Sequence, residues 1–226
     1  MSFPQWLVVS AVWLLLPAIA VAQEGTAKPD ATKPGAADAD AAKEKSGEPE
    51  VAVIETSMGR IAFQFHADCP KTVSNFKKLA GEGFYNGTTF HRVLPGFVIQ
   101  GGDPNSKDAD RSNDGQGGPG YTVPAEIKHK HKRGSVATAR LPDSVNPKQD
   151  SSGSQFYVAV KALPQLDNNY TVFAEVIEGM DVVDKIVMVP RDGRDNPNES
   201  VVMKSVTVVK LSDYKKSAGQ PKKTEG

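Results

Sequence analysis

The residues with the clearest capacity for chemistry lie in the run Phe-His-Arg-Val-Leu-Pro-Gly-Phe-Val-Ile-Gln-Gly-Gly-Asp, from Phe90 to Asp103. Arg92 precedes a strand-like stretch in which Val98 and Gln100 are expected to face the same side. A guanidinium is planar and carries five N–H donors in a rigid fork, so an arginine beside aromatic residues and a glutamine can address a bound peptide bond. The alternative for Arg92 is a surface charge beside a strand, the usual place of an arginine.

Four further motifs follow along the chain: Gly117-Gly-Pro-Gly-Tyr-Thr-Val-Pro-Ala-Glu126, Gly134-Ser-Val-Ala-Thr-Ala-Arg140, Gly153-Ser-Gln-Phe-Tyr-Val158, and Leu166-Asp with Tyr170-Thr-Val-Phe173 soon after. Together with the first run, this ordered set closely resembles the cyclophilin family over essentially Val51 to Leu211. One short motif alone is weak evidence, whereas five in the family's order and approximate spacing are specific. The resemblance implies a mainly β fold, a closed antiparallel eight-stranded barrel capped by two helices, and peptidyl-prolyl cis-trans isomerase (rotamase) activity.

The resemblance also implies a mechanism without cofactor or metal. In cyclophilins the arginine that matches Arg92 donates a hydrogen bond to the prolyl nitrogen. Amide resonance sets a rotation barrier of about 18–20 kcal/mol, and a donor at the nitrogen competes for the lone pair that creates it. Catalytic roles are therefore expected for Arg92, Phe97 and Gln100, with Gln100 holding either the neighbouring carbonyl or the guanidinium.

The ring of a substrate proline needs an apolar slot, and the family match supplies candidates for it. The expected substrate-binding residues are Val98, Ala139, Arg140, Gln155, Tyr157, Leu166 and Tyr170. For any one apolar residue, ordinary core packing is the competing interpretation. Strand alternation places Phe156 in the core and Tyr157 on the opposite side.

Several of these positions depart from the commonest eukaryotic pattern. Gln165 stands where a tryptophan often packs, Tyr170 where a histidine often lies, Tyr157 replaces a phenylalanine and Val98 a methionine. Bacterial-type cyclophilins vary at these positions, so the chain is interpreted as an active enzyme of that type. The stretch Leu141–Ser152 is longer than in compact members and is expected to enlarge a loop beside the groove.

Other combinations of residues do not support a competing chemistry. The run Gly115–Gly120 lacks the Gly-Lys-Ser/Thr ending of a phosphate loop. Lys128–Arg133 is interpreted as an exposed basic turn rather than a metal site, and His66 and His91 are isolated in the sequence, with His91 expected to be packed. The single cysteine, Cys69, excludes an intrachain disulfide and is expected to pack at a helix start.

The elements that must position these residues are mostly short strands. A hairpin is predicted from Val51–Thr56 and Arg60–Phe65, and further strands at Phe97–Gly101, Ser135–Ala139, Gln155–Val160, Val172–Ile177 and Val201–Leu211. One helix is predicted to open at Asp68-Cys69-Pro70 and end at Gly81 or Gly83, and a second to span Gly179–Val187.

The two ends of the chain are predicted to lie outside the folded domain, which is expected at 51–212. Residues 1–22 end in Ala-Val-Ala after an apolar run and are interpreted as a secretory signal peptide; because the first five residues lack Lys and Arg, an uncleaved membrane anchor is the alternative. Residues 23–50 and 213–226 lack an apolar pattern and are predicted to be a disordered linker and a flexible tail. The predicted location is therefore periplasmic or otherwise extracytoplasmic.

Composition limits the partners. The 226 residues carry 27 Lys+Arg and 27 Asp+Glu, so no net charge draws the chain to nucleic acid or an anionic membrane. The expected partners are proline-containing peptides and unfolded or flexible exported proteins, bound by a monomer. Two other functions stay open: a non-catalytic proline-peptide binding module or holdase on the same fold, and an envelope-associated protein that uses its Lys-rich tail.

Overall fold

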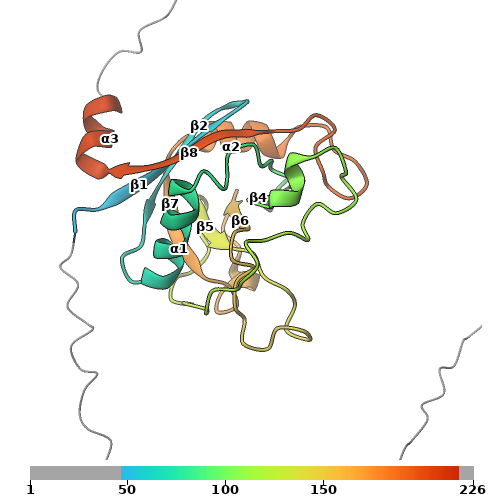
Figure 1. The fold of residues 1–226 in the computed structure, drawn as a ribbon, viewed down its shortest axis with the longest axis horizontal. Coiled ribbons are helices and arrows are strands. Elements are labelled where there is room, and N and C mark those ends of the chain that lie inside the picture. The colour runs from blue at the N-terminus through green and yellow to red at the C-terminus, as the bar shows by residue number, and fades with distance from the viewer. Residues whose placement is uncertain (1–46, 219–226) are drawn as a thin grey trace, which may run out of the picture. The chain divides into compact units, whose positions relative to one another are not determined.

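A computed structural model describes residues 47–218, and its framework is a single antiparallel sheet of eight strands (Figure 1). The strands are β1 (Glu50–Thr56), β2 (Gly59–Phe65), β3 (Arg92–Leu94), β4 (Val98–Gly101), β5 (Ser135–Thr138), β6 (Phe156–Ala159), β7 (Val172–Glu178) and β8 (Met203–Lys210). Their order in the sheet is β3-β4-β6-β5-β7-β2-β1-β8. The strands that carry most of the candidate site residues, β3 to β6, are therefore neighbours.

The sheet curls into an open half-barrel, so the prediction of a closed barrel is wrong. Strands β3 and β8 form the two edges, and they are not paired with each other in the described part of the chain. The segments just before them meet instead, through a single bridge between Thr89 and Val202 and a hydrogen bond of 3.0 Å from Phe90 N to Val201 O. Closure depends on the tilt and stagger of all strands together, which local sequence patterns do not encode.

The two predicted helices are present. Helix α1 (Pro70–Gly81) begins with a proline in its first turn and buries Phe76, Leu79 and Ala80. Helix α2 (Met180–Val187) buries Val183 and Ile186 completely. Both helices contribute to the main core, where α1 contacts β8 and α2 contacts β2. Short 3₁₀ turns lie at Pro104–Lys107 (η1) and Pro164–Leu166 (η2).

A third helix, α3 (Leu211–Ala218), occupies the start of the segment that the sequence predicted as a flexible tail. Tyr214 is buried against Val51, Val53 and Ala62, and its hydroxyl donates to the Glu178 carboxylate. The folded part of the chain therefore extends beyond residue 212. The predicted signal peptide, the linker up to residue 46 and the tail from residue 219 lie outside the described residues.

None of the helices between residues 47 and 218 has both the length and the apolar character needed to cross a membrane.

The N-terminus of α1 is capped from a distant part of the chain. Cys69, at the N-cap position, makes no capping hydrogen bond with its side chain. The Glu126 carboxylate instead accepts hydrogen bonds from the backbone nitrogens of Lys71 (3.1 Å) and Thr72 (2.8 Å). This contact satisfies two of the unpaired donors at a helix start and fixes the loop that leads to β5.

Strand β6 divides its side chains between two apolar clusters. Phe156 packs edge-on against Phe76 in the main core, with ring centroids 5.7 Å apart. Tyr157, on the opposite side, joins Val98 and Leu163 in a smaller cluster. The predicted alternation at these two positions is confirmed, and the smaller cluster forms the base of the site described below.

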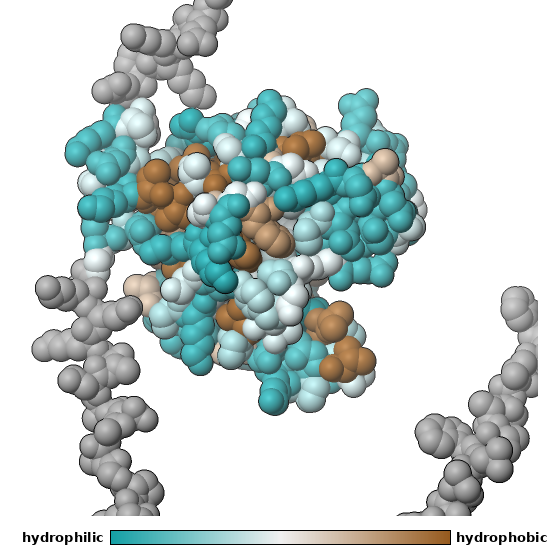
Figure 2. Space-filling view, in the orientation of Figure 1, coloured by the Kyte–Doolittle hydropathy of each residue, from teal (hydrophilic) through white to brown (hydrophobic). Residues whose placement is uncertain are grey.

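The long loop between β5 and β6 extends outward at the lower edge of the view in Figure 1. Leu141 and Val145 are both exposed, and Figure 2 shows hydrophobic side chains at this edge of a largely hydrophilic face. The loop is joined to the groove through Arg140, whose guanidinium pairs with Asp143 at 2.5 Å. The loop therefore lies beside the candidate groove, as the sequence predicted.

Candidate active site

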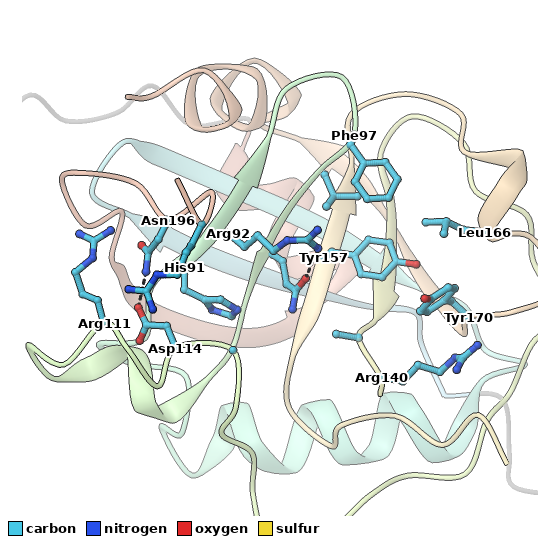
Figure 3. A pocket seen from close by; sticks show the side chains of 15 residues that line it. His91, Arg92, Phe97, Arg111, Asp114, Arg140, Tyr157, Leu166, Tyr170 and Asn196 are labelled. Atoms are coloured by element: carbon cyan, nitrogen blue, oxygen red, sulfur yellow. Dashed lines mark hydrogen bonds between the residues drawn. The ribbon is translucent and has the colours of Figure 1, made fainter. Parts of the chain in front are cut away.

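One cleft of about 340 Å³ brings together all of the predicted site residues except Gln155 (Figure 3). Its lining includes Arg92, Phe97, Val98, Gln100, Ala139, Arg140, Tyr157, Leu166 and Tyr170. These residues come from β3, β4, β6 and the segments that follow β5 and precede β7. The cleft thus spans one face of the neighbouring strands β3 to β6.

Arg92 stands at the start of β3, a strand that the sequence did not predict, directly opposite Gln100 on β4. Its Nη1 donates to Gln100 Oε1 at 3.3 Å, and Gln100 Nε2 donates to Gln155 Oε1 at 3.0 Å. Gln155 is buried behind Gln100 and donates to the carbonyls of Gly115 and Gly117. A chain of amides therefore holds the guanidinium from one side, with Gln155 as its anchor rather than as part of the lining.

The rest of the Arg92 guanidinium remains open to the cleft. Among residues 47–218, no carboxylate lies within ion-pair distance of it, and the bond to Gln100 is its one side-chain hydrogen bond. The residue is half-buried. Its charge and most of its donors are consequently available to a ligand.

An apolar slot lies beside Arg92, formed by Phe97, Val98, Tyr157, Leu166 and Tyr170. The rings of Tyr157 and Tyr170 meet edge-to-face, with centroids 5.9 Å apart. At the outer end of the slot, the Arg140 guanidinium lies 4.6 Å from the centre of the Tyr170 ring. The slot therefore has an aromatic base and a cationic rim.

A buried histidine that the sequence placed on an exposed basic turn supports this slot. His131 Nε2 lies 2.8 Å from the Tyr157 hydroxyl, and its Nδ1 lies 3.1 Å from Asp167 Oδ1. The same carboxylate oxygen accepts the backbone N–H of His131 at 2.8 Å. The exposed basic turn is confirmed for Lys128, Lys130, Lys132 and Arg133, and His131 is its buried exception.

The polarity of this chain follows from its members. A carboxylate only accepts, so Nδ1 of His131 carries the proton and Nε2 accepts from the Tyr157 hydroxyl. Burial lowers the pKa of His131 despite the Asp167 carboxylate, which keeps the ring neutral at neutral pH. Burial likewise raises the pKa of Tyr157, so its hydroxyl stays a donor. The chain fixes the tyrosine ring at the base of the slot.

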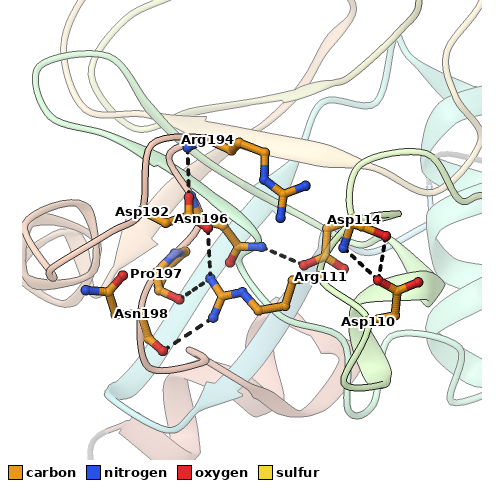
Figure 4. Close-up of polar contacts among 9 residues, drawn as sticks. Asp110, Arg111, Asp114, Asp192, Arg194, Asn196, Pro197 and Asn198 are labelled. Carbon is orange, nitrogen blue, oxygen red and sulfur yellow. Dashed lines mark hydrogen bonds and ion pairs between the residues drawn. The ribbon is translucent and has the colours of Figure 1, made fainter.

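The cleft continues past Arg92 into a second half, which we call the polar half: His91, Arg111, Asp114, Arg194 and Asn196. The sequence predicted none of the five as site residues: it expected His91 to be packed and gave no role to the last four. They come from two loops, 104–117 and 190–198, that are far apart along the chain (Figure 4). No short motif contains both loops, so sequence spacing offered no signal for their meeting.

Two sets of bonds hold the loops of the polar half together. Arg111 donates to the carbonyls of Pro197 (2.6 Å) and Asn198 (3.3 Å), and Asn196 Nδ2 donates to Asp114 Oδ2 at 2.6 Å. The carboxylate of Asp103, which is fully buried, accepts from the backbone nitrogens of the first loop and anchors it to the end of β4.

A separate group of polar side chains lies at the start of α1. The rings of His66 and His129 stack with centroids 4.1 Å apart, so His66 is not isolated, and His129 Nε2 lies 2.8 Å from Asp68 Oδ1. Cys69 is buried beside them, and burial raises the pKa of its thiol to about 12. A neutral thiol is a poor nucleophile and metal ligand, which fits its predicted packing role.

Comparison with known proteins agrees with this geometry. The family model for cyclophilin-type peptidyl-prolyl cis-trans isomerases matches residues 51–208. A peptidyl-prolyl cis-trans isomerase of Helicobacter pylori is 45% identical over 141 residues, which cover 60% of this chain and 78% of the relative. Peptidyl-prolyl cis-trans isomerase B of Bacillus subtilis is 41% identical over 126 residues, covering 54% and 79% of the two chains.

Solved structures give the same result. A cyclophilin-type peptidyl-prolyl cis-trans isomerase of Cryptosporidium parvum superposes with a TM-score of 0.64 at 29% identity, covering 71% of this chain and 98% of the other. The structure of that protein in the presence of the dipeptide Ala-Pro gives a TM-score of 0.63 at 30% identity, with coverage of 70% and 98%.

The family match begins in β1, ends in β8 and includes every residue that lines the cleft. The related enzymes share one activity, rotation about the peptide bond that precedes a proline. The chain therefore belongs to the family of cyclophilin-type peptidyl-prolyl cis-trans isomerases and is an enzyme of this activity.

Proposed function

We propose that the protein is a bacterial-type, exported cyclophilin that accelerates rotation about X-Pro bonds in exported proteins and so assists their folding, with Arg92 as the donor to the prolyl nitrogen. The observation that carries the mechanism is the position of Arg92 between the apolar slot and the open polar half of the cleft. The hydrogen bond from its guanidinium to Gln100 orients the side chain and leaves other donors for a substrate.

The slot and the guanidinium have complementary tasks. The proline ring packs among Phe97, Tyr157 and Leu166, which fixes the imide nitrogen near Arg92. A planar imide nitrogen is a weak acceptor because its lone pair is delocalised, and it becomes a good acceptor only when the bond twists. A hydrogen bond from Arg92 therefore stabilises the twisted state more than either planar isomer, and this difference accelerates rotation.

The structure of the Cryptosporidium protein in the presence of Ala-Pro supports a proline-containing peptide as the ligand of this slot. The side chains that line the slot here are uncharged, as a proline ring requires, and the Arg140 side of the cleft offers polar groups to the flanking peptide.

Export is supported by the N-terminal sequence, with its apolar run and Ala-Val-Ala ending at residue 22. Uncatalysed X-Pro isomerisation takes tens to hundreds of seconds and can limit folding, so a catalyst is useful where exported chains fold. Mass spectrometry of protein from its native host should find Gln23 as the first residue; an intact Met1 would instead support a membrane anchor.

The mechanism is tested by two substitutions at one position. Arg92→Ala should reduce kcat/KM on an Ala-Pro peptide by a factor on the order of 10²–10³, the usual loss for one preorganised donor. Arg92→Lys should also be poor, because lysine keeps the charge and loses the rigid fork. NMR exchange spectroscopy measures the rates, and Arg191→Lys, outside the cleft, is the matched control.

Three results would contradict the proposal. Near-full activity of Arg92→Lys would favour general electrostatics over a directed bond. Loss of the fold in Arg92→Ala would assign the residue a structural role. A folded wild-type protein that binds proline peptides without accelerating exchange would be a binding module.

A further inference from the structure

The polar half of the cleft contains groups that rotation about an imide does not need. His91, Arg111, Asp114 and Asn196 lie beyond Arg92, on the side away from the proline slot (Figure 3). Arg194 also lines the cleft and comes from the loop that carries Asn196 (Figure 4). A substrate that extends from the slot past Arg92 must therefore run along charged side chains. The question is which substrate side chain these groups would bind.

The loop that carries Arg194 is held firmly beside the catalytic strand. The Asp192 carboxylate accepts the backbone N–H groups of Arg194 (2.8 Å) and Asn196 (3.0 Å). Asp195 has a φ of 64°, a left-handed conformation that is uncommon for residues other than glycine. Its carbonyl accepts the backbone N–H of Val93 at 2.8 Å, next to Arg92. Arg194 thus projects from a well-defined turn.

The charged side chains of the polar half differ in how many hydrogen-bond and ion-pair partners they have. The Arg111 guanidinium is occupied by two carbonyls and lies 3.6 Å from the Asp192 carboxylate. Asp114, the single carboxylate that lines the cleft among the described residues, is bound by the Asn196 amide. Arg194 is exposed, and its guanidinium forms neither a hydrogen bond nor an ion pair with the described residues; Figure 4 shows a bond only at its backbone nitrogen. Arg92 and Arg194 therefore both line the cleft without an ion-pair partner among the described residues.

A buried histidine in the same half also lacks partners. His91 is 4% exposed, and neither Nδ1 nor Nε2 has a hydrogen-bond partner within the described part of the chain. Such an orphaned buried group is rare and calls for an explanation. Burial lowers the pKa of His91, so its ring is neutral and offers one N–H donor.

We propose that the polar half is an anion subsite that binds the side-chain carboxylate of an aspartate or glutamate adjacent to the X-Pro bond. Arg194 is its specificity-determining residue, and the buried His91 ring forms part of its wall. The inference rests on the proposed binding of the proline ring in the apolar slot. It makes the enzyme selective for acidic neighbours of proline.

The subsite is tested with acetylated and amidated peptides that differ only in the residue before or after the proline, which is glutamate, glutamine or lysine. Amidation removes the terminal carboxylate, so any effect comes from the side chain. At one of the two positions, kcat/KM for glutamate should exceed that for glutamine by about two- to fivefold, the range of an exposed ion pair. Lysine should fall below glutamine, and the preference should shrink as salt is added.

Variants assign the preference to Arg194. Arg194→Gln should bring the glutamate-to-glutamine ratio to about one, and Arg194→Glu should reverse the preference towards lysine. The matched control is Arg191→Gln, which removes the same charge from the same loop; Arg191 pairs with Asp195 and does not line the cleft. In NMR titrations, the His91 ring signals should shift more with the glutamate peptide than with the glutamine peptide.

Each outcome separates the two proposals. Acceleration of glutamate and glutamine peptides at equal rates, or a preference that persists in Arg194→Gln, would overturn the subsite and leave the isomerase mechanism standing. A lysine preference of the wild type would also overturn it, in favour of Asp114 as the dominant charge. Failure to accelerate any of the peptides would instead contradict the proposed function itself.

Discussion

The hydroxyl of Tyr157, in the proline slot, is linked through His131 to the carboxylate of Asp167, which lies outside the slot. His131 accepts from this hydroxyl and donates to Asp167, so the aromatic base of the slot is part of a polar chain. A phenylalanine at this position would have the same ring and no such connection. The hydrogen bond to His131 therefore fixes the orientation of the Tyr157 ring, while the ring itself supplies the apolar surface of the slot.

We expect Tyr157→Phe to lower the free energy of unfolding by about 1–3 kcal/mol, because Nε2 of His131 would be left buried and unpaired. Activity should fall less than tenfold, since the apolar ring stays in the slot. Urea denaturation and NMR exchange measure the two effects. Unchanged stability would show that the hydroxyl is not bound by His131.

Buried histidines should also make stability depend on pH. Burial lowers the pKa of His66, His91 and His131 from the ordinary value of 6.5, so below that value the unfolded chain binds protons that the folded chain does not. The free energy of unfolding should therefore be fully present above about pH 6.5 and decrease as the pH falls towards about 5. Urea denaturation across this range measures the slope. A constant or rising stability towards pH 5 would contradict this account.

Some residues of the site could be identified from the sequence and others could not. Arg92, Gln100 and Tyr157 lie in motifs whose types and spacing identify them, and the structure brings them to one cleft. His131 and Arg194 could not be found in this way, because their importance arises from contacts with distant segments. A histidine flanked by lysines resembles a solvated turn until its buried partners are known.

At the level of elements, helix α1 depends on a carboxylate that is far away in the sequence. Glu126→Ala removes the acceptor for the backbone N–H groups of Lys71 and Thr72 and should cost about 0.5–2 kcal/mol of unfolding free energy, as for other lost helix caps. Thermal or urea denaturation measures the loss. The control is Glu82→Ala at the other end of α1, where an acidic side chain gives no helix-dipole stabilisation. Equal effects of the two substitutions would contradict the capping role.

The elements that the sequence predicted have either a repeating apolar pattern or a short apolar run bounded by turn residues. Helices α1 and α2 and the longer strands show repeating apolar positions, whereas β3 has three residues and no recognisable alternation. Helix α3 has only Leu211 and Tyr214 as apolar contacts with the body of the protein, and its other residues are those of a solvated tail. Both were missed because tertiary contacts, rather than local pattern, stabilise them.

The folded protein should tolerate the loss of residues 1–46 but should be destabilised by the loss of the segment from residue 211 onwards. Deletion of residues 1–46 removes no described contact and should leave the melting temperature and kcat/KM unchanged. Deletion from residue 211 onwards removes Tyr214 from its contacts with β1 and β2 and should lower the melting temperature. Deletion from residue 219 onwards is the matched control for the second truncation. Calorimetry that finds the 211 and 219 truncations equally stable would contradict the docking of α3.

Seven of the eight strands were predicted from local patterns, and the family resemblance implied an antiparallel sheet of eight; the open shape of that sheet was not predicted. Turn residues and short apolar runs mark strands, whereas the gap between β3 and β8 depends on the sum of many small twists. The polar half of the cleft could not be predicted either, because it forms only where the loops 104–117 and 190–198 meet in the folded protein.

The division of β6 between two clusters has a consequence for how this protein can diverge. Phe156 and Tyr157 are neighbours in the chain, yet the first packs in the main core and the second in the cluster at the base of the slot. Because adjacent side chains of a strand point to opposite faces, selection can act on one without disturbing the other. A library varied at Tyr157 and Leu166 should therefore yield mostly folded enzymes with altered ligand preferences, whereas one varied at Phe156 should yield mostly aggregates.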